Sequence, residues 1–243
     1  KEEPLRMLRA VRISAELGFS IEKKTGGFIK KNACLIRKSA PERIKDEVYK
    51  ILICRGSAKA FEEMLKNGLL EELFPEAAAC RNLAKVYYSK YGVLTHLLDS
   101  LNRTDYILEN LKNLFPKYQV QMKSYLYEVI PGGSPRYATL KLAAFLHNIG
   151  KAPTAKMRKG RLRFFYHEEE GDKMISNISK RLRLSGKEGS LISLLTLAHM
   201  RPGNLAYQKE ITEKAKYRFF RDYGDESVAV LLISLADRFT YLK

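Results

Sequence analysis

Apolar residues recur at helical spacing along nearly the whole sequence, and this periodicity limits the fold to packed helices. Residues 131–135, rich in Pro and Gly, are typical of a loop. Only residues 156–166 have strand character, and they favour a hairpin that turns at Lys159 and Gly160. We therefore predict an all-α fold. Helices are expected over residues 4–17, 25–32, 41–54, 57–66, 69–74, 93–113, 118–128, 138–149, 167–183, 187–200, 210–222 and 225–241.

A change in composition near residues 82–92 indicates a boundary between two helical units. The sequence there becomes rich in Tyr and Lys, and a new helical pattern begins near Val93. With 243 residues, the chain is long enough for one large domain or two small ones. We predict two packed helical units, over residues 1–85 and 86–243.

Two helix starts are expected to be capped by serine side chains. Ser39 and Glu42 have the spacing of a capping box, in which each side chain bonds the backbone amide of the other residue. Pro41 between them suits a first helical turn. Ser57 is expected to cap the helix that follows.

The strong positive charge points to a polyanionic partner. Lys and Arg number 44 and Asp and Glu number 27, which gives a net charge of +17. Nucleic acid is the first candidate for the partner, and an anionic membrane surface is the second. No apolar run approaches the length that spans a bilayer, so we expect no membrane insertion.

The three cysteines form no metal-binding or redox pattern. Cys34, Cys54 and Cys80 lie far apart, each among apolar neighbours. We expect them to be buried, reduced thiols, which is typical of a cytoplasmic protein.

An arginine ridge opens the chain. Arg6, Arg9 and Arg12 recur every three residues beside a ridge of apolar side chains. Each guanidinium presents a planar fork of donors, which suits the recognition of bases and phosphates. The alternative is the solvated face of an ordinary helix.

All four histidines fall in the second unit, at positions 96, 147, 167 and 199. Helices that bring His96, His147 and Asp237 together would form a site with imidazole and carboxylate donors for a divalent metal. The alternative is that these histidines are ordinary polar residues with satisfied hydrogen bonds.

The segment with strand character is also strongly basic, and aromatic residues follow it directly. Cations beside aromatic rings can bind phosphates and stack bases, so this segment is a candidate RNA-binding site. Alternatively, Phe164 and Phe165 belong to the core. The candidate RNA-binding residues are Lys156, Arg158, Lys159, Arg161 and Arg163.

The second unit resembles an HD domain, the helical fold of metal-dependent phosphohydrolases. That family's ligands are a His, a His-Asp pair and a distal Asp, which His96, His147 and Asp237 match in part. Asn148 stands where the family has Asp. An amide is neutral and a poor ligand for hard cations, so the resemblance implies at most weak binding of a single divalent metal.

The first unit resembles the segment after the catalytic head in class II tRNA nucleotidyltransferases and bacterial poly(A) polymerases. The similarity lies in residues 2–12, 15–19, 39–50 and 68–76. In that family an Asp and an Arg bind the Watson–Crick edge of the incoming CTP or ATP. The resemblance places Glu3 at the Asp position and Arg6 at the Arg position, with Arg9 as the neighbouring helix arginine.

The resemblance also implies a catalytic head that this sequence does not contain. In the family, a Gly-Ser turn holds the triphosphate and an Asp-x-Asp strand holds Mg²⁺. The sequence has no Asp-x-Asp. We therefore expect this chain alone to be inactive, with its head in a longer protein or on another polypeptide.

Three functions follow from these patterns. The first is CMP or AMP transfer to an RNA 3′ end, with tRNA as the expected RNA and CTP and ATP as the expected nucleotides. The second is metal-dependent phosphohydrolase activity of the HD-like unit. The third is RNA binding without catalysis.

Overall fold

The computed structural model describes residues 3–85 and 92–241, and they form an almost entirely helical fold. The predicted all-α class is confirmed. Residues 86–91, within the predicted boundary, lie outside the described residues, and the boundary itself stays a prediction. The amino-terminal helices are α1 (Leu5–Leu17), α2 (Lys23–Asn32), the 3-10 helix η1 (Ala33–Lys38), α3 (Pro41–Ile53), α4 (Ser57–Lys66), α5 (Leu69–Leu73) and α6 (Pro75–Ala78).

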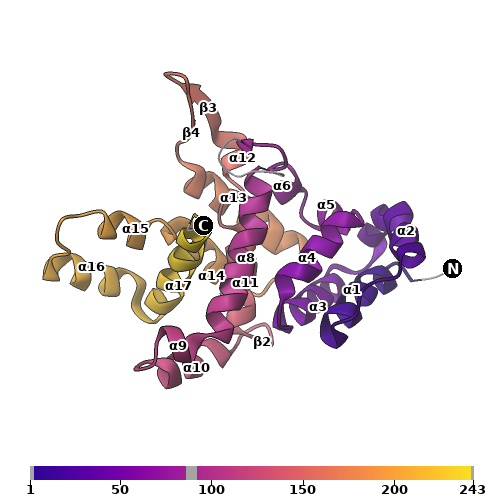
Figure 1. Ribbon diagram of the computed structural model, residues 1–243, viewed down its shortest axis with the longest axis horizontal. Helices are drawn as coiled ribbons and strands as arrows, with labels where there is room; N and C mark the ends of the chain where they lie inside the picture. The colour runs from indigo at the N-terminus through magenta and orange to yellow at the C-terminus, as the bar shows by residue number, and fades with distance from the viewer. Residues whose placement is uncertain (1–2, 86–91, 242–243) are drawn as a thin grey trace.

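After these comes the long helix α8, which runs through the middle of the molecule in Figure 1, and helices α15 and α16 project away from it as an arm. The helix expected over 93–113 is broken at Asn110 into two pieces. The helices are α8 (Val93–Glu109), α9 (Leu111–Leu114), α10 (Gln119–Tyr127), α11 (Arg136–Leu146), α12 (Lys151–Thr154), α13 (His167–Arg181), α14 (Gly186–Ala198), α15 (Arg201–Ala206), α16 (Glu213–Tyr223), the 3-10 helix η2 (Gly224–Glu226) and α17 (Ser227–Phe239).

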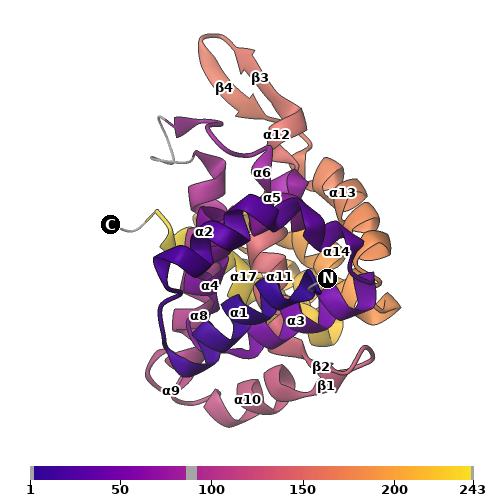
Figure 2. The same cartoon turned by 90° about the vertical axis from the view of Figure 1, so that its right-hand side faces the viewer.

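Two small antiparallel sheets interrupt the helices. Strands β3 (Ala155–Arg158) and β4 (Arg161–Phe164) form the predicted hairpin, and its turn is at Lys159 and Gly160. Both turn residues have positive φ, which matches the twist of a two-residue hairpin. The hairpin projects from the helical body in both views (Figures 1 and 2). The second pair is β1 (Val129–Ile130) and β2 (Ser134–Pro135); β1 directly precedes the loop expected over residues 131–135, and β2 lies within it.

The serine caps are placed wrongly by the sequence analysis. Pro41 is the first residue of α3, so Ala40 is the cap residue, and the Ser39 hydroxyl has no hydrogen-bond partner. Helix α4 begins at Ser57 itself, after Gly56 in the left-handed region. A capping box that the analysis missed precedes α14, where Ser185 and Glu188 bond each other's backbone amides.

The predicted burial of the cysteines is correct for only one of the three residues. Cys80 is fully buried, and burial raises the pKa of its thiol to about 12. Cys54 is half-buried, and Cys34 is exposed on η1. All three are free thiols. Among the described residues, no helix is both long and apolar enough to cross a membrane.

One hydrophobic core joins the amino-terminal helices to the helices that follow. Phe61 of α4 and Phe74, which follows α5, meet Phe145 of α11 edge to face, with ring centroids 4.9 and 5.6 Å apart. All three rings are fully buried. The two predicted units are therefore packed together through aromatic contacts.

A buried ion pair lies at the same junction. The ammonium group of Lys141 on α11 is 2.7 Å from the carboxylate of Asp105 on α8, and both side chains are only 4% exposed. Lys141 also donates to the carbonyl oxygens of Leu52 and Cys54 at the end of α3. Asp105 accepts hydrogen bonds from the Ser57 hydroxyl and from the Ala58 amide at the start of α4. Asp105 thus performs the capping role that was predicted for Ser57.

Removing the cation of this pair should strongly destabilise the protein. We expect Lys141→Met to lower the free energy of unfolding by about 3–5 kcal/mol, because it leaves Asp105 buried and unpaired. Lys59→Met, on an exposed face of α4, is the control and should change stability by no more than about 0.5 kcal/mol. Urea unfolding followed by circular dichroism measures both, and equal effects would contradict this account.

Candidate functional site

The three residues predicted to bind nucleotide lie together at the start of α1. Glu3 lies just before the helix, and its carboxylate is 3.6 Å from the guanidinium of Arg9. The same carboxylate pairs with Arg43 on α3. Arg6 lies on the exposed face of α1. A carboxylate and two guanidinium groups therefore line one surface, where Glu3 pairs with Arg9 and Arg43, and Arg9 also pairs with Glu47.

Glu47 of α3 holds the arginine ridge in place, and the sequence analysis gave it no role. Its carboxylate accepts from Arg12 at 2.7 Å and from Arg9 at 3.4 Å, and the residue is only 3% exposed. Burial disfavours its charged form, but the hydrogen bond and charge of Arg12 outweigh burial and lower the pKa below its ordinary value of 4.5. Arg9 and Arg12 of the ridge are thus held by hydrogen bonds to Glu47, in contrast to the side chains of a freely solvated helix face. The spacing of Arg9 and Arg12 is the only sequence signal for such a bridge.

The predicted metal ligands converge in the structure. His96 comes from α8, His147 from the end of α11 and Asp237 from α17, and one ligand atom of each lies within 4.8 Å of the others. Nε2 of His96 is 3.0 Å from Oδ1 of Asp237, and Nε2 of His147 is 3.3 Å from the same oxygen. Three distant segments therefore direct their donor atoms to one point.

Hydrogen bonds on the far side of each ring direct these nitrogens inward. Nδ1 of His147 lies 2.8 Å from the carbonyl oxygen of Ala144, and Nδ1 of His96 lies 3.1 Å from the Thr240 hydroxyl. That hydroxyl donates to the carbonyl of Asp237, so it accepts from His96. Burial lowers the pKa of His96 to about 4, which keeps its ring neutral at neutral pH. The inward Nε2 atom of His96 is then a lone-pair donor, as metal ligation requires.

Asn148 occupies the centre of this arrangement. Its Nδ2 is 2.6 Å from Nε2 of His147 and 2.9 Å from Nε2 of His96. The two N–H groups of the amide thus satisfy the two imidazole lone pairs, while its Oδ1 is buried without a partner. An amide turned by 180° would offer Oδ1 as a ligand. The donor set therefore fits one divalent ion, which must compete with the Asn148 amide.

Two further histidines extend the cluster, and the sequence analysis did not assign them. The rings of His147 and His199 are 4.8 Å apart, and those of His199 and His167 are 5.6 Å apart, in edge-to-face contacts. Burial lowers the pKa of both His167 and His199. His167 Nε2 is buried without a hydrogen-bond partner. The sequence feature that could have predicted their place in the cluster is that all four histidines lie in the second unit.

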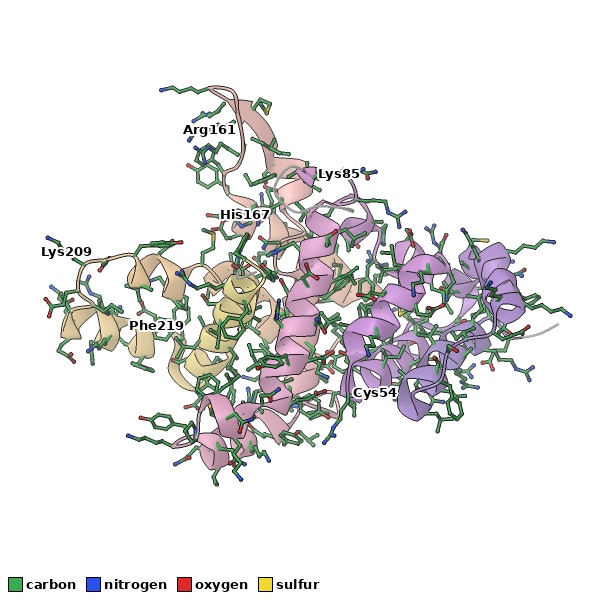
Figure 3. The ribbon with its side chains drawn as sticks, viewed as in Figure 1. Cys54, Lys85, Arg161, His167, Lys209 and Phe219 are labelled. Atoms are coloured by element: carbon green, nitrogen blue, oxygen red, sulfur yellow. The ribbon has the colours of Figure 1, made fainter. Side chains whose placement is uncertain are left out.

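The predicted RNA-binding cations all lie on the β3–β4 hairpin, and all of them are exposed. Figure 3 shows Arg161 on this hairpin and His167 at its base. The base is tightly packed, because a Cβ atom at Gly150 would lie 2.0 Å from the carbonyl oxygen of His167. The hairpin is therefore fixed next to the histidine cluster. Its cations and the nucleotide-binding residues form two separate candidate sites.

The brace at Glu47 predicts a pH-dependent contribution to stability. We expect Glu47→Gln to lower the free energy of unfolding by about 1–3 kcal/mol near neutral pH, since Arg12 loses a charged partner. The folded-state pKa of Glu47 is depressed, so its stabilisation is present above pH 4.5 and is lost as pH falls through that lowered value. The difference between wild type and variant should therefore shrink in acid.

Urea unfolding of both proteins at neutral and acidic pH measures this effect. Glu16→Gln is the matched control, because Glu16 also pairs with Arg12 but is more exposed. Glu16→Gln should lower the free energy of unfolding by no more than about 0.5 kcal/mol. A Glu47→Gln effect that does not change with pH would show that the carboxylate charge is unimportant.

Two family models match the chain, one after the other. The model described as the probable RNA and SrmB-binding site of polymerase A matches residues 18–81. The HD domain model matches residues 93–242, which is more than half of the chain. The matched ranges lie in the two parts of the sequence in which the resemblances were found, although residues 2–12 fall outside both models.

Curated relatives support the same assignment. A CCA-adding enzyme of Lactobacillus gasseri is 46% identical over 72 residues, covering 30% of this chain and 18% of that protein. Poly(A) polymerase I of Haemophilus influenzae is 35% identical over 79 residues, covering 32% and 18%. An A-adding tRNA nucleotidyltransferase of Deinococcus radiodurans is 25% identical over 207 residues, covering 82% and 42%. The chain thus spans less than half the length of these relatives. It belongs to the family of tRNA nucleotidyltransferases and poly(A) polymerases and contains an HD domain.

Proposed function

We propose that this chain takes part in nucleotide addition at an RNA 3′ end, as the nucleotide-selecting and RNA-binding part of a template-independent nucleotidyltransferase. The observation that carries the proposal is the succession of a polymerase RNA-binding match and an HD match. The Deinococcus radiodurans relative, named for A addition to tRNA, aligns across both parts. We accordingly propose tRNA as the RNA and CTP or ATP as the nucleotide.

The nucleotide-selecting role is proposed for Glu3, Arg6 and Arg9. A carboxylate accepts a hydrogen bond from an exocyclic amine, and a guanidinium donates to a carbonyl oxygen or ring nitrogen. Cytosine and adenine both present an amine beside an acceptor. Arg43 and Arg9 hold the Glu3 carboxylate, and Glu47 holds Arg9. These contacts fix the positions of the selecting groups before a nucleotide binds, which reduces the entropy cost of binding.

Catalysis itself is proposed to lie in a head domain, in the same longer protein or on another polypeptide. That head would supply Mg²⁺ and the triphosphate site, since the sequence of this chain has no Asp-x-Asp. This chain alone is therefore expected to be inactive. We propose a cytoplasmic location for the assembled enzyme, where reduced thiols such as the three found here are ordinary.

Substitution of Arg6 tests the nucleotide-selecting role. In the protein that joins this chain to its catalytic head, we expect Arg6→Ala to lower kcat/KM for CTP and ATP roughly 5- to 150-fold, the effect of losing one base-reading guanidinium. Extension of a tRNA transcript, measured at several nucleotide concentrations, gives this ratio. Arg218→Ala, on the exposed face of α16, is the control and should match wild type. Equal kcat/KM values for wild type, Arg6→Ala and Arg218→Ala would exclude Arg6 from nucleotide selection.

A second candidate function, metal-dependent phosphohydrolysis, is favoured by one observation, the convergence of His96, His147 and Asp237. These residues would hold a single divalent metal, which could polarise a phosphate oxygen or activate water. Asn148 opposes binding, because its amide already occupies both imidazole nitrogens. We therefore propose that the site binds metal weakly in this protein.

Replacing the amide with a carboxylate should restore the site. We expect Asn148→Asp to bind Mn²⁺ at least about tenfold more tightly than wild type, because a charged ligand replaces two competing N–H donors. Isothermal titration calorimetry with Mn²⁺, Ni²⁺ and Co²⁺ measures affinity, and hydrolysis of a 2′,3′-cyclic nucleotide measures activity. Asn148→Ala, which removes the donors without adding charge, is the control. Tight binding by the wild type would overturn the proposed role of Asn148.

A further inference from the structure

The β3–β4 hairpin has two chemically different faces. The register pairs Lys156 with Arg163 and Arg158 with Arg161. Cross-strand partners lie on the same face of a ladder, and residues two apart on a strand share that face. These four cations therefore occupy one face, which we call the cationic face. Ala155, Met157, Leu162 and Phe164 occupy the other face.

The apolar face is directed toward the protein at its base. Leu162 and Phe164 are half-buried, whereas Arg161 and Arg163 on the same strand are exposed. The ammonium group of Lys151 on α12 lies 5.8 Å from the centre of the Phe164 ring. Ala155, Leu162 and Phe164 of this face are thus half-buried, whereas Met157 near the turn and all four residues of the cationic face are exposed.

The cationic face is unfavourable for the hairpin itself. Like charges directly opposite each other destabilise a ladder, and two of the four cross-strand pairs are of this kind. Among the described residues, no carboxylate forms an ion pair with any of the four cations. Of the three acidic residues that follow the hairpin, Glu168 contacts His167 and Glu170 pairs with Lys173. A local conflict of this sort is typical of a functional surface, where a ligand supplies the missing charge.

An aromatic ring completes the cationic face. Phe165 directly follows β4, two residues after Arg163. The Arg158 guanidinium lies 5.2 Å from the centre of the Phe165 ring. Phe165 is 53% exposed, and the next residue, Tyr166, is 74% exposed. Phosphate-binding cations beside exposed rings are the combination that binds single-stranded nucleic acid, because an unpaired base can stack on the ring. The bases of a duplex have no free face for such stacking.

We propose that the cationic face binds an unpaired segment of RNA, with phosphates on Lys156, Arg158, Arg161 and Arg163 and a base stacked on Phe165. This inference rests on the proposed function for its choice of RNA as the polyanion. It goes further, because it specifies single-stranded RNA and identifies a stacking residue. Since the hairpin is fixed at Gly150 and His167, it holds this RNA beside the histidine cluster.

Binding of a labelled oligoadenylate strand, measured by fluorescence anisotropy on this chain without nucleotide, tests the proposal. We expect tighter binding to the single strand than to its duplex with oligouridylate. Lys156→Gln with Arg163→Gln should weaken single-strand binding and reduce the salt slope of log K by about 1.4, which corresponds to two fewer phosphate contacts. Phe165→Leu should weaken single-strand binding about tenfold and leave duplex binding unchanged.

The matched control is Lys209→Gln with Arg218→Gln, which removes the same two kinds of charge from exposed positions. Lys209 lies on the arm formed by α15 and α16, away from the hairpin (Figure 3). Neither double variant should unfold at a lower temperature than wild type, since no carboxylate loses a partner and Lys156→Gln with Arg163→Gln removes a like-charge pair from the ladder. Equal loss of binding in the control would show that net charge alone binds RNA, and the proposal would be wrong.

Two further results would also overturn the proposal. Equal affinity for strand and duplex, with no effect of Phe165→Leu, would exclude stacking. Unchanged RNA binding by the hairpin variants, together with lost binding to vesicles of phosphatidylserine and phosphatidylcholine, would assign this face to a membrane surface. Because the assay needs no nucleotide transfer, its outcome is separate from that of the proposed nucleotidyltransferase function.

Discussion

The buried ion pair between Lys141 and Asp105 is the contact on which the rest of the structure most depends. Lys141 binds the carbonyl oxygens at the end of α3, and Asp105 binds the amide at the start of α4. The pair thereby joins the consecutive helices α3 and α4 to α8 and α11, which lie much later in the sequence. A second ion pair, between the half-buried Lys45 and the buried Glu188, links α3 to α14. Because α3 carries Glu47 and Arg43, these pairs also set the position of the proposed nucleotide-binding residues relative to the HD domain.

Local periodicity was enough to predict most helices and the hairpin, because each is specified by its own residues. The spacing of turn residues at Lys159 and Gly160 identified the hairpin directly. The caps at Ser39 and Ser57 were predicted wrongly. The cap of α4 comes from Asp105, which lies 47 residues after the Ala58 amide that donates to it. No local pattern reveals a cap supplied by a distant helix. The exposure of Cys34 was missed for a similar reason, because it depends on what packs against η1.

In the candidate sites too, some features could be predicted from the sequence, whereas contacts between distant residues could not. The convergence of His96, His147 and Asp237 agrees with the proposed ligand set, and Asn148 could be recognised as a departure from it by sequence alone. That its amide satisfies both imidazole nitrogens required the structure. The same holds for Glu47, whose contact with Arg9 and Arg12 spans 35 residues or more. In each site a side chain inside the protein occupies groups that could otherwise bind a ligand.

Nucleotide addition to tRNA by the native protein that contains this chain tests the central claim most directly. A tRNA transcript that lacks its terminal nucleotides would be incubated separately with each of the four nucleoside triphosphates and Mg²⁺. The proposed function predicts extension with CTP, ATP or both, and no extension with GTP or UTP. A protein that contains a catalytic head yet extends RNA with none of them, or with all four equally, would contradict it.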